Sequence, residues 1–276
     1  MLSIIICSIN NDFLNRIKKS IFNSVKVPYE IIVFDNTDSK LPITKTYNLS
    51  ALKARYDNLV FVHEDVEFLN YGWDKNIIRI LQDLRVGIVG IAGSTYLPSV
   101  PSGWYLLQQV YNHVFIHQGF KYDEQEVRFD NHGEDLTSVY LLDGVFLAMR
   151  KDIWKRFEFN EKLNGFHAYD VDICQRVSAY YQNVFTNQIE ILHHSEGNVD
   201  KTYFDTILHY KKQYLDFDYK KRNYEIEYVQ LLEFYKQLRC HYDKHDCKEK
   251  IRPFIKLKYL GFRGYFSFKK MLMYAK

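Results

Sequence analysis

The chain has little of what marks a secreted, disulfide-bonded or membrane-spanning protein. Its 276 residues include only four cysteines, whose spacing forms no disulfide framework, and this favours a reducing compartment. No run of about 18 apolar residues is present, and no basic segment followed by an apolar one precedes the first expected strand. We therefore expect a cytoplasmic protein whose contact with the inner face of the cell membrane, if any, is peripheral.

A strong net charge is also lacking, since the formal charge of +3 is too small to indicate nucleic acid as a partner. The chain instead has 47% hydrophobic and 26% charged residues, which suits one large soluble domain, or one domain with an appendage. Its 23 tyrosines and 20 phenylalanines supply core area and also suit stacking on bases and sugars.

Apolar runs and helical spacings alternate over residues 1–200. Strands are expected over residues 2–9, 30–34, 59–62, 86–92, 139–149 and 189–192, and helices over residues 13–25, 46–56, 73–84, 152–157 and 170–181. Short turns between them predict a mostly parallel sheet covered by helices and joined by right-handed crossovers. The pattern weakens over residues 93–141, which is typical of substrate loops.

The strand over residues 59–62 ends abruptly in the acidic cluster His63-Glu64-Asp65. Ligands of α/β proteins bind at the carboxyl ends of strands, and carboxylates gathered there repel one another unless a cation holds them. Magnesium is usually held by one or two carboxylates and by substrate phosphates. The cluster therefore predicts a metal–diphosphate site; the alternative, a solvated turn, fits the apolar strand less well.

Asn10, Asp35 and Asp65 each follow a strand of the expected sheet, so a nucleotide would lie across these strand ends. Asp35 would then accept a hydrogen bond from a base N–H or a ribose hydroxyl, and Asp65 would reach a metal that bridges the diphosphate. The alternative for Asn10 and Asp35 is an N-cap or turn residue.

Seven segments occur in a characteristic order: SIIICSIN, EIIVFDNTDS, TYNLSALKA, LVFVHEDVEF, LLDGVFLAMRKDIW, GFHAYDVDICQR and ILHHSEGN. In this order and spacing the chain resembles glycosyltransferases of the family 2 type, which have the nucleotide-sugar-binding GT-A fold. The resemblance covers residues 1–200. It implies an α/β, Rossmann-like catalytic domain there, followed by a helical C-terminal extension over residues 201–276 that is rich in basic and aromatic residues.

The resemblance also implies the metal ligands. The family holds its divalent metal and the donor diphosphate with an Asp-x-Asp element, and Asp65 stands at the last position of that element. His63 replaces the first aspartate, so the second ligand is either His63 itself or one of Glu64 and Glu67.

A late histidine often joins the metal or phosphate in this family, and His193 and His194 stand at its place. Adjacent residues of an extended segment point to opposite faces, so only one of the two points inward; we favour His193 slightly. Ser195 and Gly197 would let the backbone approach a phosphate closely. The alternative is a pair of ordinary imidazoles.

The remaining roles carried over concern the donor and the base. Asp35 matches the position that reads the nucleobase or ribose. Tyr47 and Asn48 match the segment that lines the nucleotide, and Asp143 and Gly144 match the contact to donor sugar and acceptor.

The catalytic base of inverting members lies in an acid pair, which is often Glu-Asp and is Tyr169-Asp170 here. Asp170 is therefore the expected base that deprotonates the acceptor hydroxyl, and Asp172 is the alternative. Both aspartates also suit the N-terminus of the following helix.

The function expected is metal-dependent, inverting transfer of a sugar from a nucleotide-diphosphate donor to a hydroxyl of a glycan or lipid-linked acceptor, as in polysaccharide biosynthesis, with Mn²⁺ or Mg²⁺. One alternative is a non-catalytic nucleotide-sugar or glycan-binding module, because the first position of the Asp-x-Asp element has changed. A nucleotidyltransferase is less favoured, because its first loop would be Gly-rich and the loop here is Asn10-Asn11-Asp12.

The chain from Lys248 onward carries nine basic residues and one acid, Glu249, interleaved with aromatic residues. It would lie either on an anionic membrane face or as a solvated helix on the catalytic domain. The segment from Cys240 to Cys247 holds ligand types suited to zinc, but its spacing fits no familiar zinc motif, and a solvated helix end is the favoured interpretation.

Overall fold

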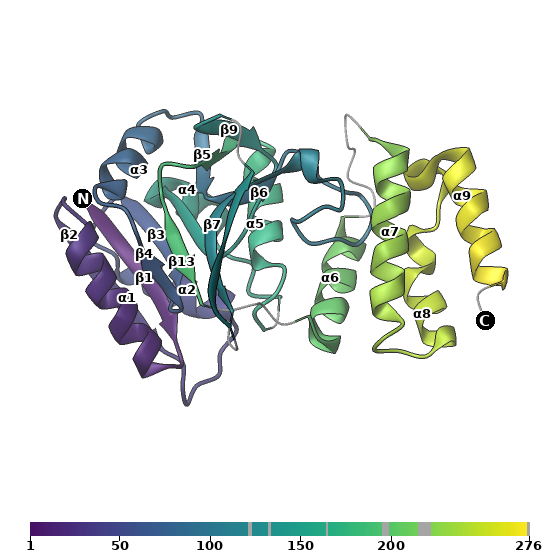
Figure 1. Ribbon diagram of the computed structural model, residues 1–276, viewed down its shortest axis with the longest axis horizontal. Coiled ribbons are helices and arrows are strands. Elements are labelled where there is room, and N and C mark those ends of the chain that lie inside the picture. Colours follow the sequence, from purple (N-terminus) through teal and green to yellow (C-terminus); the bar gives the residue numbers. More distant parts are fainter. Residues whose placement is uncertain (121–122, 132–133, 164, 195–198, 215–221, 275–276) are drawn as a thin grey trace. The chain divides into compact units, whose positions relative to one another are not determined.

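In the computed structural model the chain forms two compact units (Figure 1). The N-terminal unit comprises Met1–Tyr96 and Val110–Gly197, and the C-terminal unit comprises Leu97–Gln109 and Asn198–Lys276. The structure describes all residues except 121–122, 132–133, 164, 195–198, 215–221 and 275–276. The division into domains at residue 200 stays a prediction; residues 97–109, placed by the sequence analysis in the first domain, cluster with the C-terminal helices.

The main sheet of the N-terminal unit has the strand order β2-β1-β3-β11-β5-β12-β9. Its strands are β1 (Leu2–Ser8), β2 (Tyr29–Asp35), β3 (Asn58–His63), β5 (Val86–Gly90), β9 (Leu136–Val139), β11 (Phe146–Arg150) and β12 (Gln182–Thr186). Strand β1 is parallel to β2 and β3, and β12 is parallel to β5, whereas β11 is antiparallel to both of its neighbours. The expected α/β architecture is confirmed.

A second sheet has the order β10-β6-β7-β13-β4, with β8 paired to β7. Its strands are β4 (Val66–Phe68), β6 (Ala92–Ser94), β7 (Asn112–Phe120), β8 (Asp123–Asn131), β10 (Leu141–Leu142) and β13 (Ile191–His193). Strands β7 and β8 lie where the sequence analysis expected loops. Their many polar residues give no clear strand pattern, and the two strands are stabilised by pairing with each other. Strand β12 was also missed.

The helices of the N-terminal unit are α1 (Asn11–Ser24), α2 (Ile43–Lys53), α3 (Trp73–Leu81), α4 (Lys151–Phe157) and α5 (Tyr169–Ser178). Helix α1 is capped by the side-chain oxygen of Asn10. Its residues Ile17 and Ile21, four positions apart on one face, are buried. The apolar runs of β1 and β3 are buried almost throughout, as expected for sheet strands covered on both faces.

From residue 201 onward, the described residues of the C-terminal unit are mainly helical. The unit contains α6 (Lys201–Gln213), α7 (Tyr224–Leu238), α8 (Lys244–Ile251), η2 (Arg252–Phe254) and α9 (Leu257–Tyr274), while the short η1 (Gln109–Tyr111) leads into β7. Gly261 kinks α9, because it adopts the non-helical φ of 63° that glycine tolerates. None of the described helices is both long and apolar enough to cross a membrane.

Candidate active site

The parallel strands β1, β2 and β3 end at one edge of the main sheet. In their register Ser8 of β1 lies opposite Asp35 of β2, and Cys7 of β1 lies opposite His63 of β3. Along the strand direction, the ends of the three strands therefore lie within about one residue of one another. This register gathers the polar residues that follow the strands at a single edge, as the sequence predicted.

A second contribution comes from the short antiparallel pair β4–β13. His193 lies opposite Val66, and the backbone N–H of His194 donates to the carbonyl of Asp65 at 2.9 Å. This pairing carries the end of β13 to the turn that follows β3. As a result, His193 lies beside Asp65 although 128 residues separate them in the chain.

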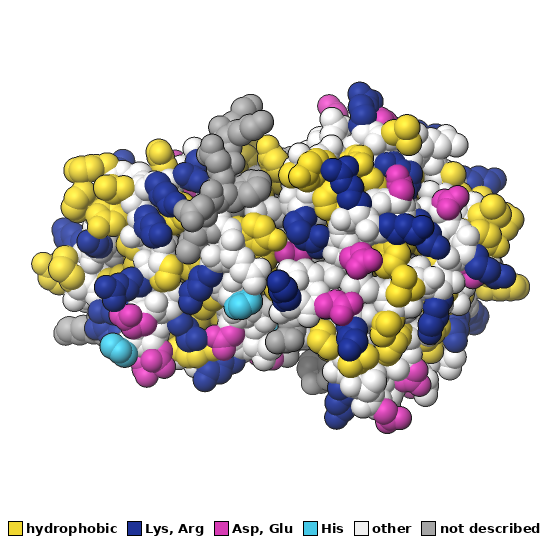
Figure 2. All heavy atoms as spheres, turned by 180° about the vertical axis from the view of Figure 1, so that it is seen from behind, with side chains coloured by type: hydrophobic (Ala, Val, Ile, Leu, Met, Phe, Trp, Pro, Cys, Tyr) yellow, Lys and Arg dark blue, Asp and Glu magenta, His cyan; other side chains and the backbone are white. Residues whose placement is uncertain are grey.

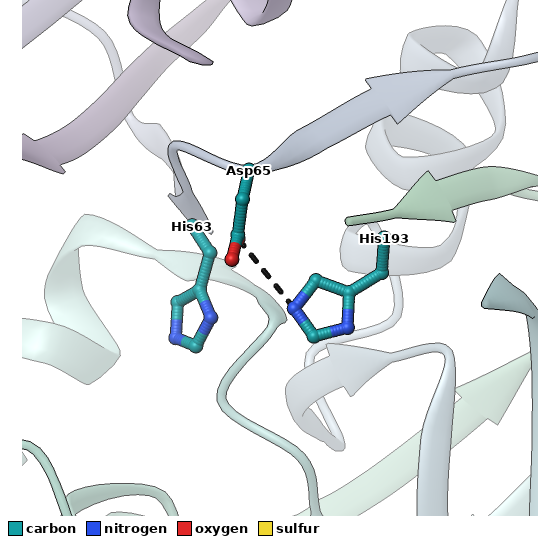
Figure 3. A group of neighbouring side chains, drawn as sticks. All are labelled: His63, Asp65 and His193. Atoms are coloured by element: carbon teal, nitrogen blue, oxygen red, sulfur yellow. Dashed lines mark ion pairs between the residues drawn. The ribbon is translucent and has the colours of Figure 1, made fainter. Parts of the chain in front are cut away.

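His63, Asp65 and His193 form a compact group of potential metal ligands, and Figure 3 shows the two rings on either side of the carboxylate. One ligand atom from each lies within 4.8 Å of the other two. Asp65 Oδ1 is 3.5 Å from His193 Nε2, which is close enough for attraction but too long for a good hydrogen bond. Such spacing leaves room for a cation between the donor atoms.

Two of these donor atoms, Asp65 Oδ1 and His193 Nε2, are buried without a hydrogen-bond partner among the described residues. An unpaired buried polar atom costs about 1–3 kcal/mol, so two that face one another require an explanation. Burial raises the pKa of Asp65, but His193 and His63 outweigh burial and hold that pKa below its usual value. Burial lowers the pKa of His63, which favours the neutral imidazole that binds metals. The group therefore fits a divalent cation.

Tyr169, the first residue of α5, links this group to the expected base. Its hydroxyl lies 2.7 Å from Nε2 of His63. Gly144 makes this contact possible, because a Cβ at position 144 would overlap the Tyr169 hydroxyl. The sequence analysis noted Tyr169 only as the replacement for an acid and did not predict its contact with His63. The available signal was its residue type, because a phenol can form a hydrogen bond with an imidazole.

Asp170 is the neighbouring residue on α5. Its Oδ2 accepts from the backbone N–H of Gly144 at 3.1 Å, and its Oδ1 accepts from the N–H of Val171 at 2.8 Å. Burial, together with the negative charge of Asp143, raises the pKa of Asp170 to about 7. The side chain is partly exposed. Asp170 thus has the acidity and access that a general base needs near neutral pH.

The structure gives Asp172 a different environment. Its side chain is fully buried and forms a 2.7 Å ion pair with Arg176, one turn further along α5. Asn160 donates to it as well, at 3.3 Å. These contacts occupy both oxygens of the Asp172 carboxylate. The geometry therefore favours Asp170 over Asp172 as the group that meets a substrate.

Tyr47 and Asn48 are core residues of α2. Tyr47 is 1% exposed and packs against Phe61 and Phe159, with ring centroids 5.1 and 5.3 Å away. Asn48 is also buried, and its amide accepts from the N–H of Phe159 at 3.0 Å and from the indole of Trp154 at 3.2 Å. Both side chains are therefore part of the core, and neither is exposed at the surface.

Asn10 and Asp35 are exposed at the edge of the sheet and already have local partners. Asn10 accepts from the N–H of Asp12 at 2.9 Å as the cap of α1. Asp35 accepts from the N–H of Thr37 at 3.0 Å, a contact that lowers the pKa of Asp35. Capping, the alternative interpretation of both, is thus present, and both remain accessible to a ligand.

The other candidate ligands lie apart from the group. Glu64 accepts from the N–H groups of Ile9 and Asn10 and thereby satisfies the backbone donors that follow β1. Glu67 pairs with His194 at 2.8 Å, and the His194 ring stacks on Phe13. Of the two adjacent histidines it is therefore His193 that faces Asp65. Ser195 and Gly197 lie outside the described residues.

The fold is that of a GT-A-type α/β protein, and comparisons with known proteins agree. The model of the "Glycosyltransferase like family" matches residues 3–221, so the chain belongs to that family. No curated protein matches the sequence.

The solved structures that are similar to the chain include the following two. The crystal structure of GalNAc-T7 with UDP, GalNAc and Mn²⁺ superposes with a TM-score of 0.51 at 12% identity and covers 94% of this chain. The match spans 58% of that protein, and at this identity it shows the GT-A fold alone. The crystal structure of A197 from STIV matches 71% of this chain and 86% of its own, at 14% identity, with a TM-score of 0.39 that is too low to support an argument.

Proposed function

We propose that the protein transfers a sugar from a nucleotide-diphosphate donor to an acceptor hydroxyl, with a divalent metal and with inversion at the anomeric carbon. The observation that carries this proposal is the proximity of two groups. The hydroxyl of Tyr169 lies 2.7 Å from Nε2 of His63, a member of the group His63, Asp65 and His193, and Asp170 follows Tyr169 on α5. A group that fits a cation and a carboxylate of near-neutral pKa therefore lie close together, which supports the proposal of glycosyl transfer from a diphosphate donor.

The metal would be held by His63, Asp65 and His193. When bound, it supplies positive charge that stabilises the diphosphate as a leaving group. Two imidazoles and one carboxylate suit a first-row transition ion better than Mg²⁺, which prefers oxygen ligands, so Mn²⁺ is the favoured ion. The Mn²⁺ in the GalNAc-T7 structure supports this choice.

Asp170 removes the proton from the acceptor hydroxyl. With a pKa of about 7, it is about half ionised at neutral pH and still basic enough to accept a proton. The backbone N–H groups of Gly144 and Val171 hold its two oxygens, so the carboxylate keeps one orientation. A single base acting from the face opposite the leaving group gives inversion.

The donor nucleotide would lie across the strand ends at Asn10 and Asp35, and Asp143 and Gly144 would line the sugar. The UDP bound in the GalNAc-T7 structure supports a nucleotide-sugar donor. A glycan or lipid-linked hydroxyl, as in polysaccharide biosynthesis, is the acceptor we expect.

A non-catalytic nucleotide-sugar-binding module is the second candidate. It is favoured by His63, which replaces the first acid of the Asp-x-Asp element, and by Tyr169, which replaces the acid before Asp170.

One experiment separates the two candidates. The purified protein is incubated with a panel of nucleotide-diphosphate sugars, with and without Mn²⁺, and both the thermal stability and the release of nucleoside diphosphate are measured. The transferase raises its melting temperature with donor only when Mn²⁺ is present, and it releases the diphosphate slowly to water. Stabilisation without any release after long incubation would favour the binding module, and stabilisation that ignores Mn²⁺ would contradict the metal site.

A further inference from the structure

Helix α9 is held by one face and exposes the other. Phe268 is fully buried, and its ring meets Tyr228 and Tyr235 of α7 with centroids 6.1 Å apart in each case. On the exposed side, Phe262 is 76% and Met273 is 71% accessible. Such large exposed apolar side chains are costly in water, and when they gather on one face they indicate a binding surface.

The exposed residues form one continuous face. Positions 262, 266, 269 and 273 follow the spacing of four, three and four residues that aligns side chains along a helix. The rings of Phe262 and Phe266 touch, with centroids 4.7 Å apart. We call this the basic-aromatic face; it consists of Phe262, Arg263, Phe266, Lys269, Lys270 and Met273.

The charge around this face has one sign. Residues 250–276 contain eight lysines and arginines and no aspartate or glutamate. Lys250 and Arg252 pair with acids of the same unit, Asp205 and Glu249. Among the described residues, by contrast, no carboxylate forms an ion pair with Arg263, Lys269 or Lys270, so the positive charge of the basic-aromatic face is not neutralised by the protein itself.

We propose that the basic-aromatic face binds the surface of an anionic lipid bilayer. Aromatic and long apolar side chains enter the boundary between headgroups and acyl chains, while the lysines and the arginine at their flanks meet lipid phosphates. Figure 2 shows this interleaving at its left edge, where hydrophobic side chains lie among those of Lys and Arg.

Other partners fit this face less well. A second copy would bring like charges together, since no acid lies among residues 250–276. Nucleic acid would use the cations but would leave Phe262, Phe266 and Met273 without an apolar environment. A bilayer uses both kinds of side chain, and its anionic lipids supply the charge that the face lacks. The proposal does not depend on the transferase activity.

The test is sedimentation of the full chain with vesicles of phosphatidylcholine alone or of phosphatidylcholine mixed with phosphatidylglycerol. We expect binding to the mixed vesicles only, and weakening with added salt. Each cation near an anionic surface contributes about 1 kcal/mol, so the double variant Lys269→Ala/Lys270→Ala should bind about thirtyfold more weakly. Phe262→Ser should also weaken binding, because it removes the inserted ring.

The matched controls lie on α1. Lys18→Ala/Lys19→Ala removes two adjacent exposed cations, and Phe22→Ser removes a phenylalanine that is 75% accessible, almost the value of Phe262. Both controls should bind like the unchanged protein. Equal losses in the α1 variants, binding that ignores phosphatidylglycerol, or no vesicle binding together with self-association or retention of nucleic acid would each overturn the proposal.

Discussion

Two carboxylates with buried oxygens, one in each unit of the molecule, differ in whether those oxygens have hydrogen-bond partners. In the C-terminal unit Glu227 is fully buried, and its oxygens accept from the backbone N–H groups of Ser99 and Val100 at 2.9–3.0 Å. Lys211 is buried nearby and donates to the carbonyl of Pro98 at 2.6 Å. In the N-terminal unit, by contrast, Asp65 keeps a buried oxygen without a hydrogen-bond partner among the described residues.

Whether a buried charged group has hydrogen-bond partners distinguishes groups that stabilise the fold from groups available for binding or chemistry. Glu227 and Lys211 use their polar atoms to hold residues 97–100, which are part of the long connection between β6 and β7. Burial lowers the pKa of Lys211 to about 8, although Glu227 opposes this shift. Buried groups that are satisfied in this way serve stability, whereas unsatisfied groups that converge serve binding or chemistry. Four substitutions test this contrast.

The largest effect is expected from Asp170→Asn. Loss of a general base typically lowers turnover by about a hundredfold to ten-thousandfold, while the amide keeps an oxygen for the N–H of Gly144. Turnover of donor with acceptor should collapse, and Mn²⁺-dependent binding of the nucleotide, measured by calorimetry, should persist. Asp152→Asn, on the exposed first turn of α4, should change neither. Full turnover in Asp170→Asn would exclude this residue as the base.

Glu227→Ala should instead affect stability. It leaves the buried N–H groups of Ser99 and Val100 without their acceptor, which lowers the free energy of unfolding by about 3 kcal/mol. Urea denaturation measures this change as a lower midpoint. Glu225→Ala, on the exposed first turn of the same helix, should stay within about 0.5 kcal/mol of the unchanged protein. Equal stability of the two variants would show that the buried glutamate has no structural role.

Tyr169→Phe should weaken metal binding. The phenol lies 2.7 Å from Nε2 of His63. A neutral imidazole that donates Nε2–H to this phenol keeps Nδ1 as the nitrogen that binds a cation. Removal of such a partner lowers metal affinity by about tenfold to a hundredfold. Titration with Mn²⁺, followed by its electron paramagnetic resonance signal, measures this loss. Tyr180→Phe, whose ring is exposed, is the control; an unchanged Mn²⁺ affinity in Tyr169→Phe would remove the phenol from the site.

The smallest effect is a shift in pH dependence. An acid whose pKa is raised to about 7 is the active carboxylate above that pH, so turnover should fall as the pH is lowered through 7. Asp143 contributes to this pKa by its like charge. In Asp143→Asn the acidic limb of the pH–rate profile should therefore move to lower pH by less than about one unit. A limb that moves to higher pH would contradict the assigned coupling.

Much of the N-terminal unit was predictable because its signals are local. Continuous apolar runs mark β1, β2 and β3, and four-residue spacing marks α1. Strands β7, β8 and β12 were not predictable in this way, because their residues are polar or the segment is short, and partner strands supply what stabilises them. Asn48 and Asp172 carry residue types that suit a site, yet both are buried. Asn48 accepts from the N–H of the distant Phe159, and Asp172 pairs with Arg176 of its own helix.

By itself the sequence determined the α/β alternation and the acidic cluster after β3, since both depend on residues near one another in the chain. Only the tertiary structure decided that His193, and not His194, faces Asp65, because the register of β13 on β4 selects the face to which each side chain points. It also decided that Tyr169 meets His63 across 106 residues, since that contact requires Gly144 to leave space between two separate elements.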